Sequence, residues 1–113
     1  MAMPTIDFQG KQYEVDEDGY LTNLDDWNKG LAEYIAKTED VVMTDAHWEV
    51  VNFLRDYYQK YQIAPMIKIL VKELGKTMGP SKGNTKYLYE LYPAGPAKQA
   101  CKIAGLPKPT GCV

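Results

Sequence analysis

The stretch Thr44-Asp-Ala-His-Trp-Glu-Val-Val-Asn-Phe-Leu-Arg-Asp-Tyr-Tyr-Gln-Lys-Tyr61 carries the clearest helical pattern in this chain. Its apolar and aromatic side chains recur at i, i+3, i+4 and i+7, the spacing that places residues on one face of an α-helix. The pattern predicts a helix that begins after Thr44 and runs to about Tyr61. The residues of its buried face are His47, Val50, Val51, Leu54, Tyr57, Tyr58 and Tyr61.

A second helix is expected directly after this one. The segment Gln62-Ile-Ala-Pro65 interrupts the pattern, and Pro65 suits the first position of a new helix because its missing N–H would be unpaired there in any case. An apolar stripe then continues until the glycines at 75 and 79, where the helix should end. The two helices together form a helix-turn-helix-like core. The stripe consists of Met66, Ile67, Leu70, Val71 and Leu74.

Two elements are expected before this core. Residues 5–21 alternate loosely and break at Gly10, which predicts a small β-hairpin. Asn23 is a suitable N-cap for a helix near residues 24–37, because its side chain can accept a hydrogen bond from the first turn. The expected core face of that helix is Leu24, Trp27, Leu31, Tyr34 and Ile35.

Two short helices are expected after the core, at residues 85–92 and at about 96–104. Pro93 should stop the first of them, and Pro96 should open the second. The fold class is therefore mainly α: a helical bundle with a helix-turn-helix-like core, a small N-terminal β-hairpin and a flexible C-terminal arm. We expect residues 1–104 to form a single domain and residues 105–113 to form the mobile arm.

Composition indicates an ordinary globular domain. The 113 residues are 45% hydrophobic and 25% charged, which suffices for one core. No apolar run approaches the roughly 20 residues that a transmembrane helix needs. The N-terminus lacks the basic and apolar regions of an export signal, so we expect a cytoplasmic protein.

Charge is distributed unevenly along the chain. Residues 1–61 hold 13 acidic and 5 basic side chains, whereas residues 62–113 hold 2 acidic side chains and 8 lysines. A basic C-terminal half is a candidate docking surface for anionic partners or substrates. The alternative is that the two halves attract each other within one domain, and the sequence leaves both interpretations open.

The only two cysteines, Cys101 and Cys112, lie at the base and near the end of the predicted arm. The glycines and prolines between them cannot continue a helix, so we expect Cys112 on a mobile tip and Cys101 on the last helix. Cytoplasmic thiols are kept reduced, which points to redox, sulfur or metal chemistry rather than a structural disulfide. Zinc sites use four ligands at short spacings, and the wide separation of the cysteines argues against a metal site.

The two thiols are expected to do different work. Cys101 on a helix face could simply be a small buried hydrophobic residue. If it is instead accessible, Lys98 and Lys102, which flank it on its helix, should favour its thiolate. Closing the arm into a disulfide costs roughly 3 kcal/mol of loop entropy, and such an exposed bond is typical of labile, functional disulfides. Cys112 can thus carry a sulfur atom into another protein's active site, and Cys101 can release it by attack.

Two other functions are compatible with the residues. Lys68, Lys72 and Lys76 form a basic stripe on the second helix that could face DNA phosphates, but that helix has no Arg, Asn or Gln to read base edges. A thiol-disulfide redox sensor would form the same disulfide without carrying sulfur. His47 has no neighbouring nucleophile in sequence, and we expect it to be structural.

The run from Gly83 to Val113 resembles the C-terminus of the DsrC/TusE family. Its most specific part is the Pro-x-Gly-Cys-x terminus with a second cysteine eleven positions earlier. The resemblance extends over essentially the whole chain. Its other segments are Asp18-Gly-Tyr-Leu21, Trp27, His47-Trp48 and Phe53-Leu-Arg-Asp-Tyr-Tyr58.

The resemblance implies a sulfur-carrier protein, the gamma subunit and co-substrate of dissimilatory sulfite reductase, and not an enzyme in its own right. Cys112 matches the sulfur-bearing thiol, which holds a persulfide or joins Cys101 in a trisulfide. Cys101 matches the second, resolving thiol. TusE-type members, which relay sulfur for tRNA thiolation, keep only the penultimate cysteine, so Cys101 and the loop at residues 79–83 point to the DsrC branch. DNA binding has been considered for this family on the basis of its helix-turn-helix-like core.

The partners that the resemblance implies are the alpha and beta subunits of the reductase, sulfur-relay donor proteins and a membrane-bound complex that reduces disulfides. We expect this chain to bind no cofactor or metal, since sirohaem and iron-sulfur clusters would belong to the reductase. The residues expected at the docking surface are Lys98, Lys102, Lys108 and Gly111, with the lysines neutralising anionic sulfur species.

Overall fold

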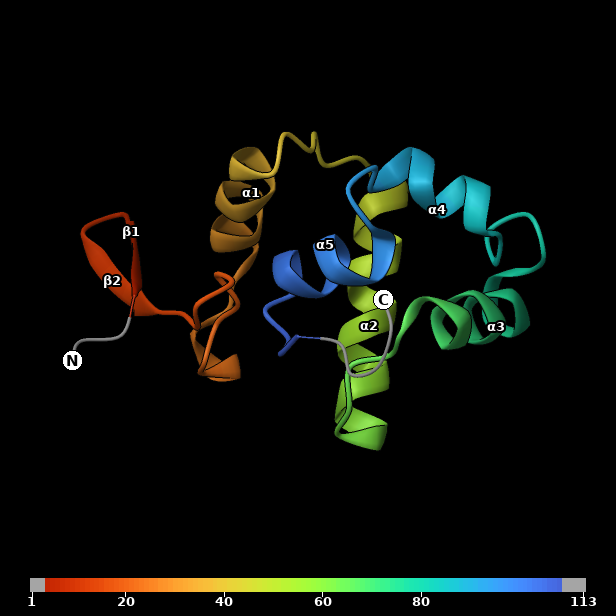
Figure 1. The fold of residues 1–113 in the computed structure, drawn as a ribbon, viewed down its shortest axis with the longest axis horizontal. Helices are drawn as coiled ribbons and strands as arrows, with labels where there is room; N and C mark the ends of the chain where they lie inside the picture. The colour runs from red at the N-terminus through yellow and green to blue at the C-terminus, as the bar shows by residue number, and fades with distance from the viewer. Residues whose placement is uncertain (1–3, 109–113) are drawn as a thin grey trace.

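Helix α5 (Pro96–Ile103) lies in the middle of the molecule, with the other α-helices around it (Figure 1). The computed structural model describes residues 4–108. Within them α5 contacts each of the other α-helices, and six of its eight residues are buried. The remaining elements, in chain order, are β1 (Thr5–Phe8), β2 (Lys11–Glu14), the 3-10 helix η1 (Leu24–Asp26), α1 (Lys29–Thr38), α2 (Asp45–Tyr61), α3 (Ile67–Met78) and α4 (Thr85–Leu91).

The helix predicted from the 44–61 pattern is present over its whole length as α2. Val50, Val51 and Leu54 are almost fully buried, so the predicted core face is confirmed in the first part of the helix, but the prediction that Tyr61 is buried is wrong. Tyr61, at the far end, is half exposed because that end of α2 extends beyond the other helices (Figure 1).

His47 fixes the beginning of α2. The Thr44 backbone N–H donates to His47 Nδ1 (3.2 Å), and His47 Nε2 lies 2.8 Å from the Leu91 carbonyl oxygen. Because Nδ1 accepts a hydrogen bond, Nε2 carries the proton and donates it to Leu91. The prediction that His47 is structural is confirmed.

The helix predicted near residues 24–37 is divided in two, and the prediction of a single helix is wrong. Asn23 caps η1, as predicted, but η1 ends after one turn. The chain is extended at Trp27, and Asn28 then caps α1 by accepting a hydrogen bond from the Leu31 N–H (2.8 Å). Because the Asn28 side chain accepts a hydrogen bond from the following backbone, it favours the start of a new helix over continuation of η1.

The two prolines that were predicted to begin helices, Pro65 and Pro96, differ in their positions relative to α3 and α5. α3 begins at Ile67 and not at Pro65, because Met66 is extended (ψ 168°) and acts as the N-cap. Pro96, in contrast, occupies the first turn of α5 as predicted. The ends of α3, before Gly79, and of α4 also agree with the prediction to within a residue.

The predicted hairpin is confirmed. β1 and β2 pair antiparallel, and Gln9 and Gly10 between them both have positive φ (50° and 77°). That combination gives a two-residue turn whose twist matches the strands. The hairpin lies at one end of the molecule (Figure 1), and Tyr13 is the single buried residue of its two strands.

The core forms where α1, α2, α3 and α4 meet α5, which makes the fold mainly α, as predicted. No helix among the described residues is long and apolar enough to cross a membrane. The largest fully buried side chains include Leu31, Ile35, Leu54, Leu70, Leu74, Leu88, Tyr92 and Ile103.

Candidate functional site

Cys101 lies on the buried face of α5 and has no solvent-exposed surface. Burial raises the pKa of its thiol to about 12, because the protein interior disfavours the charged thiolate. The thiol is therefore protonated at neutral pH. Since the thiolate is the nucleophile, Cys101 is unreactive in this conformation.

The expectation that Lys98 and Lys102 favour the Cys101 thiolate is wrong for this conformation. Lys102 directs its ammonium group to Glu39 Oε2 (3.3 Å), and Lys98 is exposed. Desolvation of the thiol therefore decides its pKa. Adjacency in sequence placed the lysines near Cys101, but it could not show that the sulfur points into the core and the ammonium groups away from it.

Two buried tyrosines, Tyr20 and Tyr92, also respond to the Cys101 charge. Burial raises the pKa of both phenols, and a negative charge on Cys101 would raise it further. The Tyr20 hydroxyl donates to the Lys98 carbonyl oxygen (3.1 Å), and the Tyr92 hydroxyl donates to the His47 carbonyl oxygen (3.0 Å). Each phenol has a single proton, so in these arrangements neither donates to the sulfur.

The three predicted docking lysines meet in one place. Lys98, Lys102 and Lys108 line a hollow of about 160 Å³, together with Asp18, Tyr20 and Glu39. Lys108 Nζ lies 2.7 Å from Asp18 Oδ2, in addition to the Lys102–Glu39 pair. Both carboxylates come from the acidic N-terminal half, so attraction between the two halves accounts for two of these lysines.

The contact between Lys108 and Asp18 shifts the pKa values of both side chains in the directions expected for an ion pair. The hydrogen bond and the positive charge of Lys108 lower the pKa of the Asp18 carboxyl, and the same contact raises the pKa of Lys108. Both side chains are half exposed, so solvent screens the pair. The contact joins the turn after β2 to the segment that follows α5.

The segment after α5 is packed on the domain. Leu106 is buried and belongs to the core, so the expectation that the chain loosens from residue 105 onward is wrong for its first two residues. Cys112 and Gly111 lie outside the described residues. Their predicted roles, and the mobility of the rest of the arm, stay predictions.

Sequence reasoning assigned Trp27 to a helix face and gave Arg55 no role. The structure places both at the end of α5. Trp27 Nε1–H donates to the Ile103 carbonyl oxygen (2.8 Å), and Arg55 Nη1–H donates to the Ala104 carbonyl oxygen (2.6 Å). The available signal was the position of Arg55, the single arginine of the chain, close to Leu54 and Tyr58, which were predicted to be buried.

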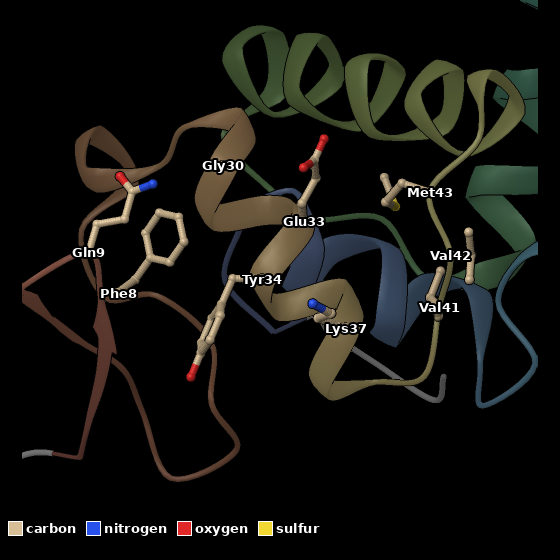
Figure 2. A pocket seen from close by; sticks show the side chains of 9 residues that line it. All are labelled: Phe8, Gln9, Gly30, Glu33, Tyr34, Lys37, Val41, Val42 and Met43. Carbon is tan, nitrogen blue, oxygen red and sulfur yellow. The ribbon is translucent and has the colours of Figure 1, made fainter.

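Another hollow, of about 590 Å³, lies elsewhere. Figure 2 shows it beside α1, lined by side chains from the β1–β2 turn, from α1 and from the segment before α2. Cys101 is not among its lining residues, and within residues 4–108 no group of three His, Cys, Asp or Glu side chains could hold a metal ion. The lining residues are Phe8, Gln9, Gly30, Glu33, Tyr34, Lys37, Val41, Val42 and Met43.

The lysine stripe on α3 is accessible. Lys68, Lys72 and Lys76 are all exposed, and Lys76 lies 4.0 Å from Glu73 on the same helix. Exposure is necessary for contact with DNA phosphates but does not show it. DNA binding stays a prediction.

Comparisons with a family model, with curated proteins and with solved structures all identify the same family. Residues 7–113 match the model of the family described as DsrC like protein. A curated relative from Photorhabdus laumondii, named Sulfurtransferase TusE, is 48% identical over 94% of this chain and 96% of its own length. The solution structure of Allochromatium vinosum DsrC is 58% identical and covers all of both chains, with a TM-score of 0.88. The crystal structure of the oxidised gamma subunit of dissimilatory sulfite reductase from Archaeoglobus fulgidus is 44% identical, with a TM-score of 0.82 over 97% of this chain and 100% of that one.

Proposed function

The chain belongs to the family of DsrC-like proteins, and from this membership we propose that it is a sulfur carrier in which Cys112 bears the sulfur and Cys101 releases it. The observation that supports the division of labour is the burial of Cys101 in α5. A thiol that is covered and protonated does not compete for the incoming sulfur. It becomes useful only after Cys112 has been loaded.

The release step needs no external oxidant. Cys101 loses its proton to water, and its thiolate attacks Sγ of the Cys112 persulfide. The new bond joins the two cysteine sulfurs, the bond between Cys112 Sγ and the outer sulfur breaks, and that sulfur leaves as hydrosulfide. A trisulfide between the two cysteines cannot form from the Cys112 persulfide and the Cys101 thiol alone, because joining them removes two electrons and two protons. That product requires sulfur delivered above the persulfide oxidation level, as an intermediate of sulfite reduction on the partner enzyme would be, and its return to two thiols requires a separate thiol or reductase.

We place docking at the hollow of Lys98, Lys102 and Lys108. Lys98 is exposed, while Lys102 and Lys108 are held by carboxylates that an acidic partner surface or an anionic sulfur group could replace. Gly111 would lie next to the loaded thiol. We propose that the chain acts in the cytoplasm as a protein co-substrate, without a cofactor of its own.

For the partner we propose dissimilatory sulfite reductase, which holds the sirohaem and iron-sulfur chemistry. Three observations support this partner: the second cysteine, the 58% identity to Allochromatium vinosum DsrC, and the similarity to a gamma subunit of that reductase. Sulfur-relay donors would load the chain, and a membrane-bound disulfide-reducing complex would reset it.

A second candidate is favoured by the curated relatives. They are named Sulfurtransferase TusE, at 46–49% identity, which points to the TusE branch and away from the branch that Cys101 suggested. In that function Cys112 would accept and pass on sulfur in a relay, and Cys101 would be dispensable.

Mass spectrometry after incubation with polysulfide tests the carrier function. The wild type should gain sulfur, Cys112→Ser should not, and Cys101→Ser should gain sulfur but fail to close the 101–112 disulfide. The two serine variants are matched controls for each other. Sulfur loading that persists in Cys112→Ser would contradict the proposal.

Binding to purified dissimilatory sulfite reductase separates the two branches. The reductase function predicts a complex that Lys98→Glu weakens and that rising salt dissociates. The relay function predicts no complex, together with undiminished sulfur transfer in Cys101→Ser.

A further inference from the structure

Two side chains from distant parts of the chain hold the end of α5. Trp27, which follows η1, donates to the Ile103 carbonyl oxygen (2.8 Å), and Arg55, from the middle of α2, donates to the Ala104 carbonyl oxygen (2.6 Å). The Arg55 guanidinium carbon also lies 4.0 Å from the centre of the Trp27 ring. We call this pair the Trp27–Arg55 clamp. It joins three elements at the point where the arm begins.

The clamp satisfies carbonyl groups that a helix end leaves unpaired. The last carbonyls of a helix have no partner within the helix and usually bond to water or to a cap. Here a partly buried arginine does so, although burial lowers the pKa of Arg55 and therefore opposes its charge. A planar cation stacked on an indole and bonded to a carbonyl regains part of that cost.

The turn beneath the clamp involves Cys101 directly. The Leu106 N–H donates to the Cys101 carbonyl oxygen (3.0 Å), and the Gly105 N–H donates to the Lys102 carbonyl oxygen (3.2 Å). These two bonds, with Gly105 at φ +72°, form a Schellman motif that ends α5. Cys101 is thus tied by its backbone to the turn that the clamp holds down.

Gly105 shows how close the contact is. A Cβ atom at this position would lie 2.4 Å from Trp27 Cδ1 and 2.8 Å from Trp27 Cγ. Both the positive φ and the Trp27 ring therefore require glycine. The Gly105 backbone therefore packs directly against the Trp27 ring.

Two kinds of structure surround Cys101: the four helices packed on α5, and the turn that ends α5. Four helices contact α5, and they can leave it only if the core unfolds. The turn at 104–106 is held by the hydrogen bonds from Trp27 and Arg55 and by contact with the Trp27 ring, and a turn held by a few such contacts can open locally while the helices stay packed. Opening of this turn releases the hydrogen bond between Leu106 and Cys101 without separating the four helices from α5.

We propose that the Trp27–Arg55 clamp gates Cys101: it holds the 103–106 turn closed, and its release exposes the thiol for the closing step. The proposal rests on the proposed function only in assigning that step to Cys101. Trp27 and Arg55 are positioning residues here, and the clamp itself forms and breaks no covalent bond.

The test measures alkylation of Cys101 by N-ethylmaleimide in a Cys112→Ser background, where Cys101 is the only thiol. Trp27→Phe keeps an aromatic ring but loses the N–H donor, and should raise the alkylation rate about five- to tenfold. Arg55→Met loses a charged donor and should raise it roughly 10- to 100-fold, with Arg55→Lys in between. The control variant Trp48→Phe carries the same substitution on α2, away from the turn, and should leave the alkylation rate unchanged.

Urea distinguishes a gate from a general loss of stability. A local opening exposes little surface, so alkylation of the clamp variants should depend only weakly on low urea concentrations. Rates equal to the parent rate, or rates that follow global unfolding in every variant, would overturn the proposal. No sulfur donor is used, so the result is independent of whether Cys112 carries sulfur.

Discussion

Helix α5 and the β1–β2 hairpin represent two extremes of packing in this molecule. α5 touches every other α-helix and buries six of its eight residues, whereas the hairpin lies at one end and buries Tyr13 alone (Figure 1). The thiol on α5 is inert because of this environment. The hairpin region instead contributes an exposed carboxylate, Asp18, that reaches the segment after α5.

The difference shows that burial within α5 determines the protonation state of the Cys101 thiol. A thiol buried on α5 stays protonated, and in the proposed gate the opening of the adjacent turn activates it. Substitutions in the peripheral hairpin should have little effect on the protonation state of Cys101. The first two predictions below compare the two regions directly, the third tests the burial of the thiol on α5, and the last tests the contact that Asp18 makes.

Hydrogen exchange should show the largest contrast. Amides in the middle of α5 should exchange only when the whole domain unfolds, which costs about 5–15 kcal/mol in typical domains. Amides of β1 and β2 should exchange through local opening, several orders of magnitude faster. Native-state exchange followed by NMR measures both, and equal protection in the two regions would contradict the comparison.

Isoleucine truncation should separate the regions by a few kcal/mol. Ile103→Ala removes a fully buried side chain from α5 and should destabilise the fold by about 2–5 kcal/mol. Ile6→Ala, the matched change in β1, removes a partly buried side chain and should cost less than about 1.5 kcal/mol. Urea unfolding of both variants checks this, and similar losses would show that the hairpin is as important to the core as α5.

Alkaline pH should destabilise the wild type through Cys101. Folding raises the pKa of this thiol from 9.0 to about 12, so its contribution is complete below pH 9 and is lost as pH rises from 9 toward 12. The loss should approach about 1.4 kcal/mol per pH unit within that window. Cys101→Ala keeps the tyrosines that also titrate at high pH, so the difference between the two unfolding curves isolates the thiol. Parallel curves would mean that Cys101 is not desolvated.

The contact between Asp18 and Lys108 should give the smallest effect. Lys108 lowers the pKa of the Asp18 carboxyl, so Lys108→Gln should return that pKa toward its ordinary value, and Lys108→Arg should largely preserve the shift. The contact favours folding above the ordinary carboxyl pKa and weakens as pH falls and Asp18 is protonated. An NMR titration of the Asp18 side chain measures the shift. An unchanged pKa in Lys108→Gln would show that the pair does not form in solution.

Much of the fold could be predicted from local sequence patterns. The repeat in residues 44–61, the Gln9-Gly10 turn and Pro96 at the start of α5 each act through neighbouring residues, and all three were confirmed. The errors arose where two local signals compete. Asn23 and Asn28 both cap helices, and no local rule says that the first helix stops so that the second can begin.

The candidate site could be predicted only in part. The grouping of Lys98, Lys102 and Lys108 near Cys101 follows from their positions on and after one helix. Their pairing with Glu39 and Asp18 does not, because those carboxylates lie 63 and 90 positions away in the chain. Arg55 was missed for the same reason, since its partner Ala104 is 49 positions distant.

The sequence by itself determined most of the helices, the hairpin, the uneven charge and the presence of two thiols separated by a glycine- and proline-rich segment. The tertiary structure alone decided that Cys101 is buried with a raised pKa, that two docking lysines are already paired, and that Trp27 and Arg55 hold the end of α5. Helix periods and caps act over a few residues and are visible in sequence. Desolvation depends on which distant segments cover a group, and only the folded chain brings those segments together.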